Sequence, residues 1–398
     1  MEYRLEEICI KVTDGSHFSP KDDKNSPIPM LSVKDMKEFD FDYTNCKHIS
    51  EKDFQTMVRQ DCVPKKEDLL VAKDGSYLKE IFVNKEENKK AILSSIAIFR
   101  PNKNIVNPYF LCYMLKNPSV MKYAKDNCVS GSALPRIILK AFKDIKLDIP
   151  DLLIQNKSVK IIKNINKKII NNNQINDNLY NILEQYIKEQ YYNNEFVRNG
   201  NVNDIGKIQG GYAFKSKDLL NETTNNKVLK IKNISASGVD IDNTQCVYDE
   251  VADKVDKKFL LLRGNVIIAM TGAELGKTGY LYGQDYRYVL NQRVGVIRGN
   301  DKYSELYLNC LFLLKDMQNT LNSKGYGSAQ PNISTLDIEN IEIPIPKEDE
   351  LETFYERCNP IYSKMIFNSE QNQSLTQLRD TLLPKLMNGE IDLDKIEI

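Results

Sequence analysis

Residues 151–199 read DLLIQNKSVKIIKNINKKIINNNQINDNLYNILEQYIKEQYYNNEFVRN, without proline or glycine, and Pro150 and Gly200 bracket them. Apolar side chains recur here at alternating three- and four-residue steps, the spacing of a stripe along one face of a helix. The stripe consists of Ile162, Ile165, Ile169, Leu179, Leu183 and Tyr186. Asn172 and Asn176 fill its one gap, and polar residues at such positions can fix the register between paired helices. A single helix over residues 157–192 would be roughly 54 Å long at ~1.5 Å per residue, so its stripe needs a partner.

A matching segment lies at the end of the chain, over residues 350–389. Its leucines also repeat at helical spacing: Leu375, Leu378, Leu382, Leu383 and Leu386. Pro360 is expected to break or kink this helix near its start. Gly389 is a stop signal, and Lys385 in the last turn suits the negative end of the helix dipole.

Length and composition describe an ordinary globular protein with two or three domains. The chain has 398 residues, of which 41% are hydrophobic and 28% charged, and its formal net charge is zero. It contains no 18-residue apolar run and no N-terminal signal pattern, so we expect a cytoplasmic protein without a membrane segment.

The cysteines do not form a metal or disulfide pattern. Eight of them are scattered without a C-x-x-C pair, and only His17 and His48 could assist them. We therefore predict no metal site and buried thiols.

The chain contains an internal repeat. GSALPRI at residues 131–137 returns as GSAQPNI at residues 327–333, an offset of 327 − 131 = 196, and Ile149-Pro150 returns as Ile345-Pro346 at the same offset. DGSHF at residues 14–18 aligns with GGYAF at residues 210–214, again 196 apart. DLLVAKDG at residues 68–75 aligns with residues 265–272 at an offset of 197. A register this constant predicts a tandem duplication.

Each copy predicts an α/β (α+β) globule followed by a long helix. Both contain apolar strands (residues 68–72 and 266–270), a helical segment (109–125 and 306–322), a Gly-Ser-Ala-x-Pro loop and a strand that ends in Ile-Pro. We expect recognition domains at 1–150 and 196–346, a central helix at 151–195 and a C-terminal helix at 347–398. The two helices should pack as an antiparallel, coiled-coil-like pair, which gives the molecule approximate two-fold symmetry.

Motifs for catalysis are weak. GAELGKT at residues 272–278 resembles a phosphate-binding loop but has three residues between its glycines instead of four. Asn107 and Pro108 are expected to start a helix, as cap and first-turn residue. No Ser/His/Asp or paired-carboxylate set recurs, and the second copy has no histidine. A duplicated architecture without a repeated catalytic group suggests recognition rather than catalysis.

Side chains that can donate to phosphates or base edges collect in the turns of both copies. The candidate DNA-binding residues are Ser16, His17, Lys21, Lys73, Ser76, Tyr77, Lys79, Arg136, Lys215, Ser216, Lys217, Thr271, Glu274, Lys277, Gln292, Arg293, Gln330 and Asn332.

At these positions the chain resembles the specificity (S) subunits of type I restriction–modification systems, over its full length. The run LTQLRDTLLPKLMNGEI at residues 375–391 is similar to that family's closing helix. GYAFKS (211–216), TGA (271–273) and GSAQPNI (327–333) are similar to its recurrent landmarks. The first copy departs from them, with Asp74 where the second has Thr271 and Leu134 where it has Gln330.

The resemblance implies that each globule is a target recognition domain for double-stranded DNA and that two methyltransferase subunits dock on the helices. S-adenosylmethionine would then sit on those partners, and ATP and Mg²⁺ on a restriction subunit, whose presence stays open. The chain itself would carry no cofactor and no catalytic residue. Two other hypotheses stay open: an enzyme, either a nucleotide hydrolase using residues 272–278 or a degenerate methyltransferase or nuclease, and a coiled-coil adaptor that binds only protein.

Overall fold

The computed structural model describes residues 1–75, 78–131, 135–194, 197–235, 238–283, 285–325, 331–391 and 393. The chain divides into two compact units, of which unit 1 comprises Met1–Asn166 with Thr376–Ile398 and unit 2 comprises Lys167–Leu375. Each unit therefore contains a portion of both long helices. This division differs from the four segments expected from the sequence, which stay a prediction.

The two long helices are the longest elements of the described chain. Helix α5 runs over Leu152–Ile187 and continues into a π-helical turn at Lys188–Tyr192, and α11 runs over Glu348–Met387. The Asp151 carboxylate accepts the Ile154 amide at 3.0 Å, which caps α5. Gly389 has a φ of +70°, and the Glu390 amide donates to the Lys385 carbonyl at 2.9 Å, which closes α11 in a Schellman motif.

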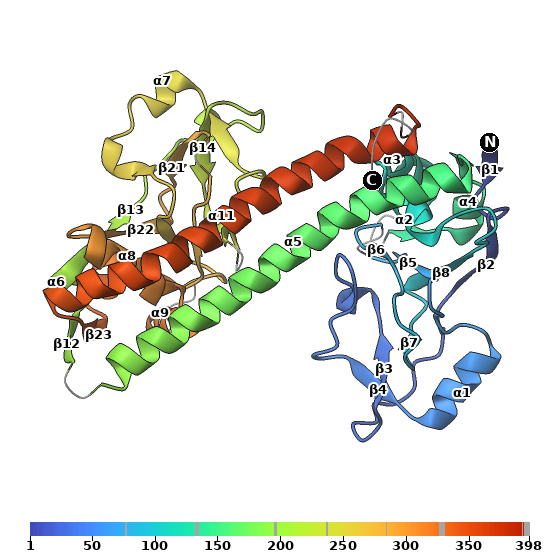
Figure 1. The fold of residues 1–398 in the computed structure, drawn as a ribbon, viewed down its shortest axis with the longest axis horizontal. Helices are drawn as coiled ribbons and strands as arrows, with labels where there is room; N and C mark the ends of the chain where they lie inside the picture. The colour runs from blue at the N-terminus through green and yellow to red at the C-terminus, as the bar shows by residue number, and fades with distance from the viewer. Residues whose placement is uncertain are drawn as a thin grey trace. The chain divides into compact units, whose positions relative to one another are not determined.

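Pro360 does not end α11, so the expected break is wrong. Figure 1 shows the helix as an unbroken coil, and it includes Pro360 and Pro384. Each proline costs one backbone hydrogen bond. Packing of the helix offsets that loss, since Phe354, Cys358 and Tyr362 on either side of Pro360 are all buried in the core of unit 2.

The sheet of unit 1 has the order β2-β8-β5-β6 and is antiparallel throughout. Its strands are β2 (Cys9–Asp14), β8 (Ile96–Pro101), β5 (Leu69–Ala72) and β6 (Ile81–Val83). A second sheet has the order β4-β3-β7, with β3 (Ile28–Leu31) parallel to β7 (Ala91–Ile92) and antiparallel to β4 (Lys47–Ile49). All four side chains of β5 are buried, as its continuous apolar run predicts.

Unit 2 repeats this arrangement. Its antiparallel sheet β13-β22-β19-β20 comprises β13 (Gly206–Gly210), β22 (Val294–Gly299), β19 (Val266–Ala269) and β20 (Thr278–Tyr280). The second sheet, β17-β14-β21-β18, again holds one parallel pair, β14 (Asn226–Leu229) with β21 (Arg287–Leu290). Its antiparallel neighbours are β17 (Gln245–Val247) and β18 (Leu260–Leu261). The short pair β1 (Glu2–Arg4) with β11 (Lys146–Asp148) has its counterpart in β12 (Arg198–Asn201) with β23 (Glu342–Ile345).

The antiparallel sheets have the same strand order, and the second sheets share the same parallel pair, with β18 as an additional strand in unit 2. This repetition confirms the predicted duplication and the mixed helix and sheet fold. Smaller helices repeat as well: α1 (Glu51–Arg59) and α4 (Leu139–Lys143) in unit 1, and α7 (Asp249–Ala252) and α10 (Thr335–Glu339) in unit 2.

Each helical segment expected over 109–125 and 306–322 is in fact two helices. In unit 1, α2 (Pro108–Lys116) and α3 (Pro118–Asn127) meet at Asn117, which caps α3 through the Ser119 amide. In unit 2, α8 (Lys302–Leu313) and α9 (Lys315–Lys324) meet at Leu314. Pro118 explains the first break, because the residue before a proline is pushed out of helical backbone angles. The predicted start of α2 is confirmed, with Asn107 as its cap and Pro108 in its first turn.

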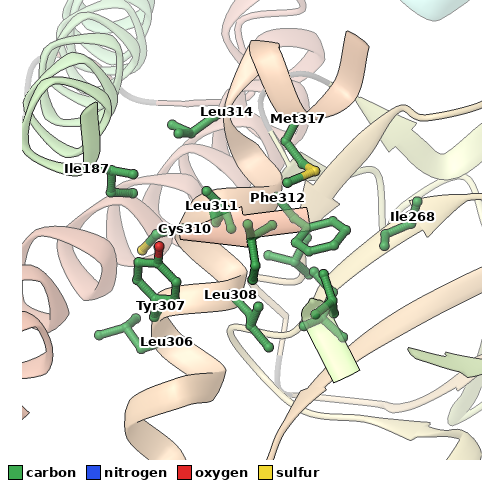
Figure 2. Close-up of a cluster of buried hydrophobic side chains, with 14 of the residues drawn as sticks. Ile187, Ile268, Leu306, Tyr307, Leu308, Cys310, Leu311, Phe312, Leu314 and Met317 are labelled. Atoms are coloured by element: carbon green, nitrogen blue, oxygen red, sulfur yellow. The ribbon is translucent and has the colours of Figure 1, made fainter. Parts of the chain in front are cut away.

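Each unit has a core that takes side chains from both long helices. In unit 1, Val159 and Ile162 of α5 join Leu383 and Leu386 of α11 in one buried cluster. In unit 2, α8 is buried in a cluster that includes Leu183 and Ile187 of α5. Figure 2 shows the α8 side chains of this cluster between Ile187 of α5 and Ile268 of β19.

Within unit 2, the polar gap in the α5 stripe meets a polar set on α11. Asn172 is fully buried, and its side-chain amide donates to Gln371 and Asn372 at 2.9 Å each. Asn368 donates to the Asn176 side-chain oxygen at 2.8 Å. Residue numbers that rise along α5 pair with numbers that fall along α11, so the two segments are antiparallel here.

No helix in the described part of the chain is both long and apolar enough to cross a membrane.

Candidate nucleic-acid interface

The loops that carry the predicted contact residues of unit 2 meet at one end of its antiparallel sheet. Strand β19 ends at Ala269, which pairs with Val294 at the start of β22, and Gly210 at the end of β13 pairs with Gly295. We call the segments that extend beyond this end turn edge 2. It comprises residues 212–217, 271–274, 291–293 and 331–332.

Backbone hydrogen bonds tie these segments together. The Met270 amide donates to the Arg293 carbonyl at 3.1 Å, and the Ile333 amide donates to the Met270 carbonyl at 3.0 Å. Thr271 forms a bridge with Asn332, and its hydroxyl donates to the Pro331 carbonyl at 3.2 Å. Three loops that are distant in sequence are thus joined through their backbones.

Gly211 lets the loop over residues 212–217 reach the same edge. A Cβ at this position would lie 2.0 Å from the Asn291 carbonyl oxygen, so no larger residue fits. The Tyr212 amide then donates to the Leu290 carbonyl at 2.8 Å. Gly15 makes the same approach in unit 1, where a Cβ would lie 2.3 Å from the Ile92 carbonyl oxygen.

Most candidate residues of turn edge 2 point into solvent. Lys215, Ser216, Lys217, Gln292, Arg293 and Asn332 are exposed. Thr271 is half-buried, with its hydroxyl bound to Pro331. Glu274 and Lys277 form an ion pair with each other at 2.7 Å, so the lysine charge is already balanced.

Unit 1 builds the same edge from equivalent residues, and we call it turn edge 1. It comprises residues 16–18, 73–75, 93–95 and 135–136. Lys73 donates its amide to the Ser95 carbonyl at 2.8 Å, and Asp74 forms a bridge with Arg136. These bonds match those of Met270 with Arg293 and of Thr271 with Asn332 in unit 2.

The candidates of unit 1 divide by exposure. His17, Lys21, Lys79 and Arg136 are exposed. Ser16 is 3% exposed and its hydroxyl closes a turn with Phe18, while Lys73 is 8% exposed and forms an ion pair with Asp14. These internal bonds occupy both side chains, so neither Ser16 nor Lys73 is available in this structure for a contact from outside.

Ser76, Tyr77 and Gln330 lie outside the described residues. The exposed candidates stay predictions, because the structure contains no nucleic acid.

Two cations beside turn edge 2 were not among the residues predicted from the sequence. Lys257 and Lys258 are exposed, and they precede Phe259, whose ring lies 5.6 Å from that of Tyr212 in an edge-to-face contact. Leu260 pairs with Val289, which places this segment beside the end of β21. Two lysines next to an aromatic residue are a signal for nucleic-acid binding that the sequence does contain.

The geometry contradicts the phosphate-binding alternative for residues 272–278. Thr278 is 3% exposed and its hydroxyl donates to the Phe312 carbonyl at 2.9 Å. A Cβ at Gly276 would lie 2.8 Å from the Gln318 carbonyl oxygen, so the loop packs against α9. Lys277 pairs with Glu274. The Thr278 hydroxyl and the Lys277 charge are therefore both engaged with protein groups, and the backbone at Gly276 is packed against α9.

The cysteines are free thiols, and five of them are buried as predicted: Cys112, Cys128, Cys246, Cys310 and Cys358. The prediction is wrong for Cys9, Cys46 and Cys62, which are half-buried. Burial raises the pKa of the Cys9 thiol to about 12. Thiolate chemistry at neutral pH is therefore disfavoured at this position.

Comparison with known proteins gives one consistent family. The family model described as the type I restriction modification DNA specificity domain matches residues 1–181 and 194–377. The type I restriction enzyme MjaVIII specificity subunit of Methanocaldococcus jannaschii is 23% identical in an alignment 388 positions long, gaps included, which covers 91% of this chain and 89% of that protein. The HindI specificity subunit of Haemophilus influenzae is 24% identical in an alignment 426 positions long, gaps included, which covers 88% of this chain and 91% of that protein.

Among solved structures, the S subunit of a type I restriction-modification system from M. genitalium has a similar fold, with a TM-score of 0.60 at 14% sequence identity. The match covers 97% of this chain and 95% of that one.

Each matched segment begins in one globular unit and runs into or through most of a long helix, and together the two segments cover nearly all of the chain. The chain belongs to the family of type I restriction modification DNA specificity domains and carries two of them in tandem.

Proposed function

We propose that this chain is the DNA sequence-specificity subunit of a type I restriction–modification complex and recognises an asymmetric, bipartite site in double-stranded DNA. One observation supports this proposal above the others. The chain builds the same turn edge twice, on the same hydrogen-bond frame, with different exposed side chains on each copy.

The composition of the two edges supports two different half-sites. Turn edge 1 offers His17 and Arg136, and turn edge 2 offers Gln292, Arg293 and Asn332. Arginine, asparagine and glutamine can read bases by paired hydrogen bonds, whereas lysine and serine mostly hold the backbone. Two similar domains in one chain should read half-sites whose centres lie about one helical turn apart, roughly 10 bp, with unspecified bases between them.

The partner proposal is two methyltransferase subunits docked on the long helices. Ile182 of α5 and Leu378 of α11 are 51% and 48% exposed, and they occupy equivalent repeat positions, 378 − 182 = 196 residues apart. Because the two side chains occupy equivalent repeat positions, two copies of one partner could each bind one of them. S-adenosylmethionine would be held by those partners, and ATP and Mg²⁺ by a restriction subunit where one joins.

The neutral net charge is consistent with a complex in which partner subunits share the DNA contacts. A protein that binds DNA alone usually shows a basic excess, because it neutralises phosphates itself. Here the formal charge is zero, so the partner subunits would supply part of the phosphate contact.

The test is to map methylated bases in cells that express this chain together with its methyltransferase, and in cells that express the methyltransferase alone. We expect one bipartite, asymmetric motif that appears only with this chain. Methylation without a motif, or the same motif without the chain, would contradict the proposal.

A second measurement separates this proposal from its two alternatives. The purified chain, incubated with DNA and labelled S-adenosylmethionine or with ATP, should show no turnover, whereas an enzyme would. Co-purification with the methyltransferase but no sequence-selective protection of DNA would instead favour a protein-only adaptor.

A further inference from the structure

Each turn edge contains a tight turn closed by the same backbone hydrogen bond, and the two residues at the tip of the turn differ between the units. In unit 1, the Ile96 amide donates to the Leu93 carbonyl at 3.0 Å and closes a turn with Ser94 and Ser95 at its tip. In unit 2, the Val294 amide donates to the Asn291 carbonyl at 3.0 Å and closes the equivalent turn with Gln292 and Arg293 at its tip. The offset between the two turns is 291 − 93 = 198 residues.

The backbone of the unit 2 turn is held from several sides. The Asn291 amide donates to the Leu229 carbonyl at 3.0 Å, and the Arg293 carbonyl accepts the Met270 amide at 3.1 Å. Gly211 packs directly against Asn291. Because the backbone of this turn is already fixed, little further backbone entropy is lost when one of its side chains binds a ligand.

The tips differ in what they offer. Ser95 in unit 1 is half-buried, and its hydroxyl accepts the Val33 amide at 3.2 Å. Gln292 and Arg293 are exposed, and neither side chain has a hydrogen-bond or ion-pair partner within the described ranges. By contrast, Arg263, Arg287 and Arg298 of unit 2 are all engaged with protein groups.

An exposed and unengaged guanidinium on a rigid turn suits base readout. Its planar fork matches the O6 and N7 acceptors of guanine in the major groove, the commonest specific contact between proteins and DNA. Lys215, Lys217 and Lys258 on the neighbouring segments are exposed cations that could hold phosphates. Phosphate contacts can thus be made by these lysines, which leaves Arg293 for a base contact.

The geometry points to Arg293 as a specificity-determining residue that reads one guanine in the half-site recognised by unit 2. This inference rests on the proposed function. Because unit 1 has Ser95 at the equivalent position, its half-site is read there by other groups.

The first test uses methylated-base mapping with the complete complex in cells. We expect Arg293→Ala to accept other bases at one guanine position while every other position of both half-sites stays unchanged. Arg293→Gln should shift the preference at that position toward adenine, because glutamine pairs with the adenine N6 and N7 edge. Arg287→Ala is the control: this exposed arginine starts β21, the strand that leads into the turn, at the end far from the turn, and the motif should not change.

The second test begins with the wild-type complex, so its main result does not depend on any variant folding. The purified wild-type complex is bound to duplexes in which 7-deazaguanine, which lacks the N7 acceptor, replaces each guanine of the site in turn. One position in the unit 2 half-site should weaken binding by roughly 5-fold or more, below the ~150-fold limit for loss of a whole bidentate contact, because the substitution removes N7 and leaves O6. The Arg293→Ala complex should bind the natural and substituted duplexes equally at that position.

Three outcomes would overturn the inference. The first is that no 7-deazaguanine position in that half-site weakens binding, and the second is that Arg293→Ala leaves the motif unchanged. The third is that Arg293→Ala lowers methylation equally at all sites and reduces the salt dependence of DNA binding, which marks a phosphate contact. Each presupposes that the wild-type complex has a motif. A wild-type complex without any motif would instead refute the proposed function.

Discussion

Arg100 and Arg298 occupy equivalent positions in the two units but have different partners. In unit 1, Arg100 forms two hydrogen bonds of 2.9 Å with Asp68, which is 1% exposed. In unit 2, Arg298 donates to Asn265 at 2.8 Å, and burial lowers the pKa of its guanidinium. One copy thus contains a charged pair where the other contains a cation and a neutral amide.

The charged pair predicts a large effect in unit 1. Arg100→Met should lower the free energy of unfolding by about 3–5 kcal/mol, because it leaves the Asp68 carboxylate buried without a counter-charge. Urea unfolding followed by circular dichroism would measure it.

Asp68→Asn is the matched control, because it copies Asn265 of unit 2. It keeps an acceptor for the Lys65 amide, which lies 2.8 Å from the carboxylate. Its expected loss is about 1–2 kcal/mol. Equal losses in Arg100→Met and Asp68→Asn would contradict this account.

Asp61 predicts a pH dependence. The hydrogen bond from Lys11, at 2.6 Å, and the Arg100 charge lower the pKa of its carboxyl to about 2, from an ordinary value of 3.8. A carboxyl whose pKa is lower in the folded state stabilises the protein above pH 4 and loses this effect as the pH falls toward 2. Asp61→Asn should therefore be less stable than wild type at pH 7, and the difference should shrink below pH 4.

The size of this effect should be modest, because the Asp61 side chain is 40% exposed and solvent screens its ion pairs. Unfolding midpoints of both proteins at pH 7, 5, 4 and 3 give the comparison. A difference that stayed constant over this range would show that Asp61 acts through packing instead of charge.

At the residue scale, the sequence predicted which loops carry the polar side chains but not which of those side chains are free. Lys73 and Lys79 look alike in sequence, yet Lys73 is buried against Asp14, which lies 59 residues earlier in the chain. Such a partner depends on β2 and β5 each ending at the same edge of one sheet. That arrangement is a tertiary fact, so local sequence patterns do not contain it.

At the element scale, the asparagines of α5 are the feature with the sharpest test. Asn172→Ala removes two hydrogen bonds from a fully buried position and leaves the Gln371 and Asn372 oxygens with fewer donors. The expected loss is about 1–3 kcal/mol. Hydrogen exchange of amides in residues 167–187 and 348–375 should report local loosening.

Asn171→Ala controls for helix propensity, because Asn171 is the preceding residue and is exposed. Its effect should stay within roughly 0.5 kcal/mol. If both variants behaved alike, the buried hydrogen bonds would contribute nothing to the pairing of the two helices.

The long helices also show where sequence reasoning succeeds and fails for elements. The apolar repeat from Ile162 to Tyr186, about seven turns at ~3.6 residues per turn, predicts α5 because periodicity is a local property. The expected break at Pro360 is absent because the backbone hydrogen bond lost there is outweighed by the burial of neighbours such as Phe354 and Tyr362. The division at Asn117 has a local cause in Pro118, whereas Leu314 is followed by Lys315, so neither proline nor local periodicity signals the second division.

At the scale of the whole molecule, the duplication predicts that the two half-sites can be exchanged separately. Replacing residues 5–148 with the corresponding segment of another family member should change one half-site and leave the other intact. The reason is that turn edge 1 is built entirely from residues in this segment. Methylated-base mapping of the chimeric complex would show which half-site each unit reads.

The reciprocal exchange of residues 202–341 is the control, and it should change the other half-site. A change in both half-sites from either exchange would show that the two edges are not independent readers.

The way unit 1 is closed has a consequence for the gene. Its core includes Leu383 and Leu386, which belong to the last 398 − 376 + 1 = 23 residues of the chain, whereas unit 2 is continuous. During translation, residues 1–166 must therefore wait for the segment that begins at Thr376 before their apolar surface is covered. A stop codon directly after Leu375 should accordingly destabilise unit 1, and leave unit 2 closer to its native stability.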